Sequence, residues 1–238
     1  VTKGSCVDIL VQRCPACFGG KSFGRPLPQG GDIHVALDGN FHHRHRRSAG
    51  DCPPFFHPEY ILPKKQVDDI GKRIEKERKK PPKAYKSQVP DETIDHCENA
   101  YDAADGKKQK ALSLICRHDI PLFFANIDTP GEQQKFPVAL LEHLFSLLPP
   151  DATVVALYDV GCVLARSVGK YDFLPESIVS RLRFSTTAMH AYGHEWSCQL
   201  VYNPRMAPGL GLSDGEGVER LWSRYTRLIT VESSSSVR

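Results

Sequence analysis

Hydrophobic residues in this chain fall into short runs, and the spacing within each run predicts a strand or a helix. Residues 33–37 (IHVAL) alternate with a period of two, which is typical of a strand, and the run ends at Asp38. Residues 152–158 (ATVVALY) are almost continuously apolar, as in a strand buried on both faces, and this run delivers Asp159. Two further apolar runs, 112–116 and 122–127, are joined by a short polar segment and predict paired strands.

Helical patterns lie between these runs. Apolar residues recur at helical spacing from Thr129 to Leu148, and Pro149-Pro150 then ends the predicted helix. The segment 91–105 is a second acidic helix candidate, with Asp91 or Thr93 as its cap. The remaining expectations are a charged helix over 66–85, helices across 162–168 and from Asp214 onward, a strand over 184–190, and irregular structure over 1–30 and 48–66.

The order of these elements predicts an α/β fold of the RNase H-like type, a mixed sheet flanked by helices with a helical insertion after the first strand. In that fold the first and fourth strands are neighbours, so Asp38 and Asp159 are expected to meet at the strand ends. We divide the chain into a Cys/Gly-rich N-terminal segment, 1–30, which is a candidate zinc-binding remnant, and a core, 31–238, with its insertion at about 41–111.

The acidic residues at the ends of these elements are the main candidates for chemistry. Asp38 lies in ALDGNF, Asp159 in LYDVGC, and Glu216 and Glu219 in DGEGVERLWS, which opens the last helix. A site with two divalent cations roughly 3.5–4 Å apart needs several carboxylates, because Mg²⁺ and Mn²⁺ prefer hard oxygen ligands. The alternative is ordinary surface charge, since the chain has 28 acidic residues.

Composition excludes little. A net charge of +3 permits nucleic-acid binding without arguing for it, and no apolar run approaches the roughly 20 residues of a membrane span. Basic residues cluster beside the first acidic motif, and Arg44, Arg46 and Arg47 are candidates for clamping phosphates, with solvated surface charge as the alternative.

The chain has eight cysteines and no visible secretory signal, which favours thiols or metal ligands over a disulfide framework. Cys14 and Cys17 have the spacing of half a zinc site, which Cys6, His34, Cys52 or residues outside this chain would complete. The spacing of His190, His194 and Cys198 is typical of one face of a helical turn and suggests zinc, with a polar core around Trp196 as the alternative. Cys116 and His118 are candidates to join this second group, whereas Cys162 is interpreted as a buried apolar residue.

Together, the motifs of the chain resemble those of the Kyakuja–Dileera–Zisupton transposases, especially the fungal type. The resemblance spans nearly the whole chain and depends on the order of seven segments: CPACFGG, HVALDGNF, CRHDIPL, NIDTPGEQQK, LYDVGC, MHAYGHEWSCQLVYNP and GLSDGEGVERLWS.

This resemblance implies a DDE-type transposase with an RNase H-like core that cleaves DNA at transposon ends and joins it to a target with Mg²⁺ or Mn²⁺. By position, Asp38 is the first acid and Asp159 the second. The third is Glu219, whose ER-x-W-S context is similar to the ER-x-F-S segment of the related hAT superfamily, or else Glu216. The partners implied are DNA and further copies of the chain, rather than a small molecule, in the nucleus.

Two other functions are left open by the sequence. A short path between Asp105 and Cys116 and the lack of a full zinc module fit an inactive, truncated, transposase-derived DNA-binding protein. A different RNase H-like nuclease is the other alternative, against which the specific motifs argue.

Overall fold

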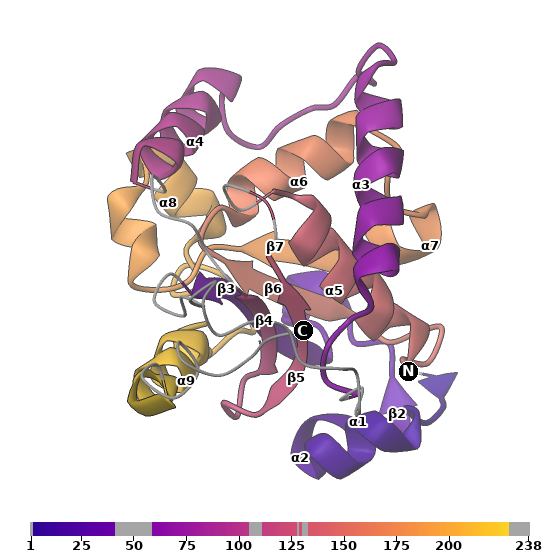
Figure 1. Cartoon of the computed structure of the whole chain (residues 1–238). Helices are drawn as coiled ribbons and strands as arrows, with labels where there is room; N and C mark the ends of the chain where they lie inside the picture. Colours follow the sequence, from indigo (N-terminus) through magenta and orange to yellow (C-terminus); the bar gives the residue numbers. More distant parts are fainter. Residues whose placement is uncertain (1, 41–58, 105–110, 128, 130–132, 229–238) are drawn as a thin grey trace.

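Five strands form one mixed sheet at the centre of the protein (Figure 1). The computed structural model describes residues 2–40, 59–104, 111–127, 129 and 133–228. Across the sheet the strands follow the order β5 (Pro121–Asn126), β4 (Ala111–Cys116), β3 (Ile33–Asn40), β6 (Val154–Tyr158) and β7 (Leu182–Ser185). The central strand β3 is antiparallel to β4 and parallel to β6, β4 is antiparallel to β5, and β6 is parallel to β7. The chain is therefore an α/β protein with a mixed sheet and flanking helices.

The two central parallel strands are buried on both faces, as their apolar runs predict. Every residue of β3 and β6 is buried. The predicted strands at 33–37, 112–116, 122–127 and 152–158 are confirmed. The strand expected over 184–190 is instead β7, which ends at Ser185, because the next backbone amides leave the sheet. Thr186 N–H donates to the carbonyl of Tyr202, and Ala188 N–H donates to that of Asp214.

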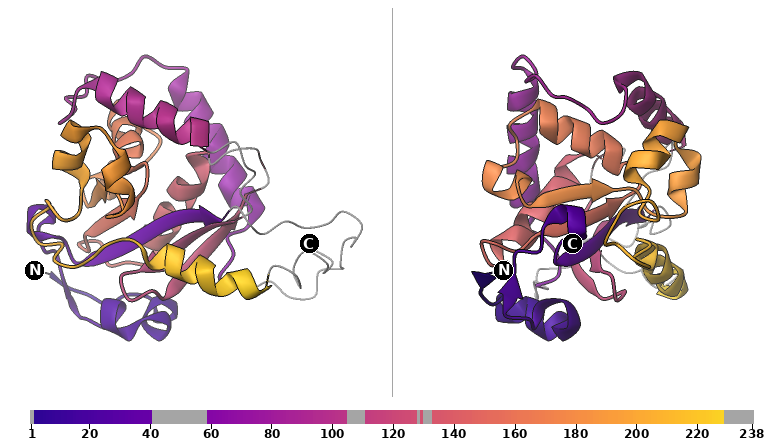
Figure 2. Two further views of the ribbon diagram at one scale, coloured as in Figure 1. Left: turned by 90° about the vertical axis from the view of Figure 1, so that its left-hand side faces the viewer. Right: turned by 180° about the vertical axis from the view of Figure 1, so that it is seen from behind.

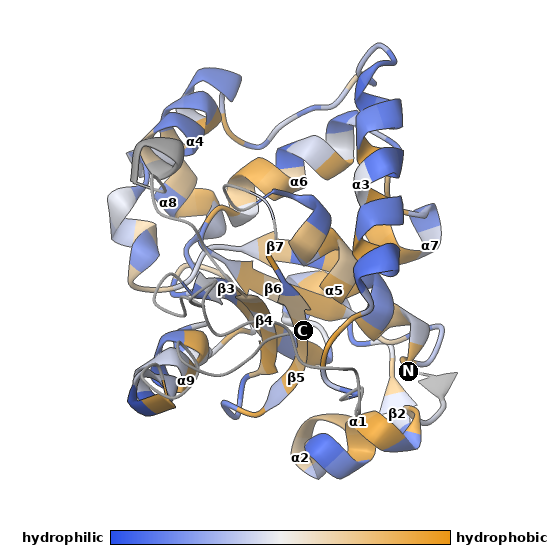
Figure 3. Ribbon diagram, in the orientation of Figure 1, coloured by the Kyte–Doolittle hydropathy of each residue, from blue (hydrophilic) through white to orange (hydrophobic). Residues whose placement is uncertain are grey.

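One face of the sheet is covered by several helices. α5 (Lys135–Ser146) is buried along most of its length, and α6 (Gly161–Lys170) follows β6. α3 (Lys64–Arg78) packs on α5 and buries only Val67, Ile70 and Ile74, so the rest of its surface is hydrophilic (Figure 3). α4 (Asp91–Ala104) and α8 (Trp196–Tyr202) pack on α6 and on each other. The helices expected at 91–105 and 162–168 are present. The charged helix expected over 66–85 spans Lys64–Arg78 instead, and the one expected from Thr129 begins at Lys135.

The opposite face carries α9 (Gly217–Tyr225), which lies on the other side of the sheet from α3 to α6 (Figure 2). Its residues Val218, Leu221 and Trp222 form an apolar cluster with the side chains of Ala36, Ile115, Val155 and Leu157. The helix begins at Gly217 rather than at the expected Asp214. Side chains alternate between the two faces along β3 and along β6. The even-numbered residues of β3 and the odd-numbered residues of β6 therefore face α9.

The N-terminal segment is not irregular, and that prediction was wrong. It contains β1 (Thr2–Lys3), α1 (Asp8–Arg13), α2 (Pro15–Phe18), β2 (Ser22–Phe23) and the 3₁₀ turn η1 (Leu27–Gln29). Helices this short are not stable alone. They are stabilised by tertiary packing, because Leu10 and Phe18 are fully buried in the main core. The guanidinium of Arg13 also stacks 4.4 Å from the ring centroid of Phe123 in β5.

The remaining short elements are α7 (Glu176–Val179) and the 3₁₀ turns η3 (His190–Gly193) and η4 (Thr226–Leu228). Among the described helices, none has the length and apolar character that crossing a membrane requires.

Candidate functional site

Asp38 in β3 and Asp159, which directly follows β6, lie at neighbouring positions on the two central parallel strands. The register pairs Leu37 of β3 with Tyr158 of β6, so the next residue on each strand is one of the two aspartates. Neighbouring strands lie about 5 Å apart, which places the two Cα atoms at that separation if the register continues. By alternation both carboxylates lie on the face that α9 covers, and both residues are buried.

Asp159 is held by two side chains from the segment after β7. The hydroxyl of Thr187 donates to Asp159 Oδ1 at 2.8 Å, and His190 Nδ1 lies 3.2 Å from the same oxygen. Burial raises the pKa of Asp159 to about 6, and the negative charges of Glu216 and Glu219 act in the same direction, whereas His190 and Thr187 oppose the shift. The carboxyl group of Asp159 is therefore in the electrostatic range of both glutamates.

The two glutamates differ in their surroundings. Glu216 precedes α9, and its Oε1 accepts a hydrogen bond from the backbone N–H of Met189 at 2.7 Å. Its other oxygen, Oε2, is buried and has no hydrogen-bond donor among the described residues. Glu219 lies in the first turn of α9 and is exposed. A buried carboxylate oxygen without a donor is costly unless a cation or a proton neutralises it, so the oxygen donors here fit a hard divalent cation.

An ion-pair network that the sequence did not reveal fixes the start of α9. Arg220 forms ion pairs with Asp119, in the turn between β4 and β5, and with Asp214, just before the helix. Its hydrogen bonds with Asp119 and then with Asp214 raise the pKa of Arg220. The spacing of Asp214 and Arg220 gave no signal, because their common partner Asp119 is distant in the sequence.

Two groups of cysteine and histidine lie outside this acidic site, and the first joins the N-terminal segment to the sheet. Cys14 and Cys17 meet Cys116 and His118, and all four ligand atoms lie within 4.8 Å of one another. Cys14 and Cys17 are brought together as expected, but Cys6, although buried, and His34 are not among the partners. His34 instead contacts Ser213 and the carbonyl of Gly30, and Cys52 lies outside the described residues.

The second group draws one residue from each of three helices and one from the turn before α8. It consists of Cys97 in α4, Cys162 in α6, His194 and Cys198, again with all ligand atoms within 4.8 Å of one another. The sequence pointed to His194 and Cys198 but not to Cys97. Cys162 is fully buried, as expected of an apolar residue, yet it is also a member of this group.

Several neighbouring expectations come out differently. His190 lies against Asp159 and not with His194 and Cys198, because residues 190–198 do not form one helix: η3 ends at Gly193 and α8 begins at Trp196. Cys116 and His118 join Cys14 and Cys17, not the second group. Trp196 is 70% exposed, so no core forms around it, whereas Trp222 is buried.

Within each of the two groups, the cysteine thiols shift one another's pKa values. Hydrogen bonding from Cys17 lowers the pKa of Cys116 to about 5, and hydrogen bonding from Cys162 lowers the pKa of Cys97 to about 5. The pKa of each donor thiol, Cys17 and Cys162, is raised in turn. In the second group, hydrogen bonding from Cys162 also lowers the pKa of Cys198, to about 7.

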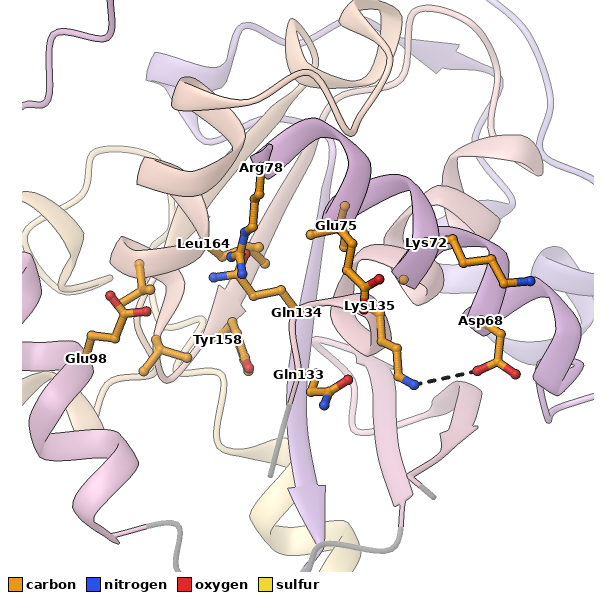
Figure 4. A pocket seen from close by; sticks show the side chains of 14 residues that line it. Asp68, Lys72, Glu75, Arg78, Glu98, Gln133, Gln134, Lys135, Tyr158 and Leu164 are labelled. Carbon is orange, nitrogen blue, oxygen red and sulfur yellow. Dashed lines mark hydrogen bonds and ion pairs between the residues drawn. The ribbon is translucent and has the colours of Figure 1, made fainter. Parts of the chain in front are cut away.

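A polar pocket of about 610 Å³ lies on the other face of the sheet, between α3, the start of α5 and α6 (Figure 4). Lys135 points across it toward Asp68 on α3, with 3.6 Å between Nζ and Oδ1. None of the predicted acids lines this pocket, which separates it from the acidic site. Arg44, Arg46 and Arg47, the predicted phosphate contacts, lie outside the described residues.

Comparison with known families identifies the chain. The family model described as Kyakuja-Dileera-Zisupton transposase matches residues 32–236, and the chain therefore belongs to this family. Neither a curated protein nor a solved structure matches it.

Proposed function

Starting from membership in this transposase family, we propose that the protein is a DDE transposase, of the fungal type, that cleaves DNA at transposon ends and joins the freed ends to a target. One observation carries this proposal. Asp38 and Asp159 end adjacent parallel strands on the sheet face that α9 covers, and α9 brings Glu216 and Glu219 within electrostatic range of Asp159. Family membership implies DNA as the partner.

The strand order supports an RNase H-like core. Numbered along the core, the order across the sheet is third, second, first, fourth and fifth, with the first strand parallel to the fourth and antiparallel to the second. α3 and α4 lie between the first and second strands, where the proposed insertion belongs. We propose that residues 1–30 are a zinc-binding remnant that packs against this core.

In the proposed site, Asp38, Asp159 and Glu219 or Glu216 hold Mg²⁺ or Mn²⁺. The cations would supply an activated water and charge stabilisation for phosphoryl transfer. The protein residues position the carboxylates: Thr187 fixes one oxygen of Asp159, and the backbone of Met189 fixes one oxygen of Glu216. Carboxylates held by strand ends and a packed helix keep their geometry better than carboxylates on loops.

His190 has a separate proposed role. Its ring is 38% exposed and lies beside Asp159, so it is placed to contact a phosphate held at the carboxylates. Arg44, Arg46 and Arg47 are proposed to contact the DNA backbone, and each lost contact should reduce the slope of log affinity against log salt by about 1.

The experiment that tests this function is Mg²⁺- or Mn²⁺-dependent cleavage and strand transfer on DNA that carries candidate terminal repeats. Asp38→Asn and Asp159→Asn should each lower both reactions by about 100-fold or more. Asp151→Asn is the matched control, because Asp151 is an exposed acid in the turn before β6.

The outcomes separate the alternatives. DNA binding without cleavage by the unsubstituted protein would favour an inactive transposase-derived DNA-binding protein. Cleavage of RNA, or of DNA without terminal repeats at equal rates, would favour another RNase H-like nuclease. A nuclear location is part of the same proposal. Self-association of the chain is another part, because synapsis brings two DNA ends together.

A further inference from the structure

We propose that the two cysteine–histidine clusters are two structural zinc sites, each with a Cys₃His ligand set: site one, Cys14, Cys17, Cys116 and His118; site two, Cys97, Cys162, His194 and Cys198. This inference concerns a different metal and different residues from the acidic site, and it does not depend on transposition. Its first support is the distribution of cysteine. Seven free cysteines are described, and each cluster contains three of them, so that only Cys6 is left over.

The distances within each cluster match those of a tetrahedral zinc centre. With Zn–S of about 2.3 Å and Zn–N of about 2.05 Å, a tetrahedron places sulfur and nitrogen about 3.6 Å apart. In site one His118 Nδ1 lies 3.2 Å from Cys17 Sγ and 3.5 Å from Cys14 Sγ. In site two His194 Nδ1 lies 3.6 Å from Cys162 Sγ and 3.5 Å from Cys198 Sγ. The same ring nitrogen faces the sulfurs in both sites.

Burial supports a structural role. Cys14 and Cys116 in site one are buried, and so are all three cysteines of site two. Four protein ligands complete a tetrahedral zinc and leave no position for water or substrate, which is typical of structural and not catalytic zinc. Sulfur and imidazole ligands also distinguish these sites from the oxygen-lined acidic site, which favours harder cations.

Site one fastens the N-terminal helices to the edge of the sheet. Two ligands come from the junction of α1 and α2, and two from the end of β4 and the turn that follows. Cys14 and Cys17 precede the segment 32–236 that the family model matches, so this site connects the preceding segment to the transposase core. His118 also adjoins Asp119, the partner of Arg220 on α9.

Site two fastens the segment between β3 and β4 to the core. Cys97 is its only ligand from that segment, whereas Cys162 follows closely after Asp159, and His194 follows closely after His190. Ion pairs of Arg166 in α6 with Asp95 and Glu98 in α4 hold the same two helices together. Zinc at site two would therefore fix α4 on α6 beside the strand end that carries Asp159.

The test is the zinc content of the full chain purified without chelator, measured by elemental analysis and native mass spectrometry. We expect two zinc ions per chain. The double substitution Cys14→Ser/Cys17→Ser should remove one ion, and Cys97→Ser/Cys162→Ser should remove the other. Cys6→Ser is the matched control and should retain both, because Cys6 is buried but belongs to neither cluster.

A second measurement covers variants that fail to fold. Cobalt exchanged into the unsubstituted protein should give the visible absorption of a tetrahedral ion together with thiolate-to-cobalt charge transfer, at two equivalents. The proposal is overturned if the chain carries no zinc and takes up none at stoichiometric concentration. It is also overturned if both double variants keep two ions, or if mass spectrometry finds the cluster cysteines paired as disulfides in freshly purified protein.

Discussion

Arg220 and Asp119 form a bidentate ion pair between α9 and the turn that joins β4 to β5. Arg220 Nε lies 2.6 Å from Asp119 Oδ2, and Arg220 Nη2 lies 2.8 Å from Asp119 Oδ1. Asp119 has a φ of 61°, in the left-handed region that Asp and Asn tolerate better than most residues. The pair links the helix that carries Glu216 and Glu219 to the turn that carries His118.

Replacing Asp119 with Asn should weaken this link without disturbing the turn. Asn accepts the same backbone conformation, so the change removes mainly the charge. Arg220 is 45% exposed, which limits the expected loss to about 0.5–1 kcal/mol of unfolding free energy, smaller at high salt. Urea unfolding at two ionic strengths measures it. Arg224→Gln, an exposed position on the same helix, is the control, and equal losses in both variants would show that the ion pair does not stabilise α9.

Glu216→Gln and Glu219→Gln should distinguish the third metal ligand. We expect Glu219→Gln to lower Mn²⁺-dependent cleavage by about 100-fold with little change in stability, because Glu219 is exposed. Glu216→Gln, by contrast, should raise the unfolding free energy in the absence of Mg²⁺ and Mn²⁺. The reason is that Oε2 of Glu216 is a buried carboxylate oxygen without a hydrogen-bond donor among the described residues. Cleavage and urea unfolding measure the two effects. If the larger loss of cleavage follows Glu216→Gln, the third ligand is Glu216, and if neither variant loses more than tenfold, no acid from this region is required.

The raised pKa of Asp159 predicts how the unfolding free energy of the protein varies with pH. Burial raises the pKa of Asp159 to about 6, above the value of about 3.9 in an unfolded chain. Between these values the folded state binds more protons, so the contribution of Asp159 to stability falls as pH rises from 4 to 6 and stays low above that. The full difference is on the order of 3 kcal/mol.

The comparison with Asp159→Asn isolates this effect. In buffers without Mg²⁺ or Mn²⁺, the variant and the unsubstituted protein should have similar unfolding free energies near pH 4, and the variant should be more stable at pH 8. Adding Mg²⁺ at pH 8 should stabilise only the unsubstituted protein. A stability difference that does not change between pH 4 and pH 8 would contradict the raised pKa.

Gly161 at the start of α6 should tolerate no side chain. A Cβ at this position would overlap the carbonyl oxygen of Ser185 in β7, and backbone atoms cannot move aside as a flexible side chain can. Gly161→Ala should lower the unfolding free energy by about 2 kcal/mol. Gly193→Ala is the control, because among the described residues, its two chain neighbours aside, no heavy atom lies within 4 Å of its added Cβ. Thermal unfolding compares the two, and equal melting temperatures would contradict the close contact of α6 with β7.

The central sheet could be predicted because its signals are local. The alternation at 33–37 and the apolar run at 152–158 each follow from burial of one strand, and both strands form where expected. The short helices α1 and α2 gave no such signal. They contain too few residues to show a period, and their stability comes from the burial of Leu10 and Phe18 by distant segments.

For the cysteine clusters too, ligands that are close in the sequence could be predicted, whereas ligands brought together from distant segments could not. Cys14 with Cys17, and His194 with Cys198, are close in sequence, so their spacing pointed to metal binding. No other member of its cluster is close to Cys97 in the sequence, and only the packing of α4 on α6 brings it to Cys162. The position of Cys162 among apolar residues favoured a core role, and burial is a property that core residues and structural metal ligands share.

The parallel pairing of β3 with β6 also sets the time at which the acidic site can exist. During synthesis β6 leaves the ribosome only after its partner β3 and the intervening elements α3, α4, β4, β5 and α5, and α9 follows after β7 and α8. Pairings between such distant segments form late, after a large loss of chain entropy. A nascent chain therefore has Asp38 without Asp159, and then both without α9. The acidic site is complete only after α9 has been synthesised and has packed on the sheet.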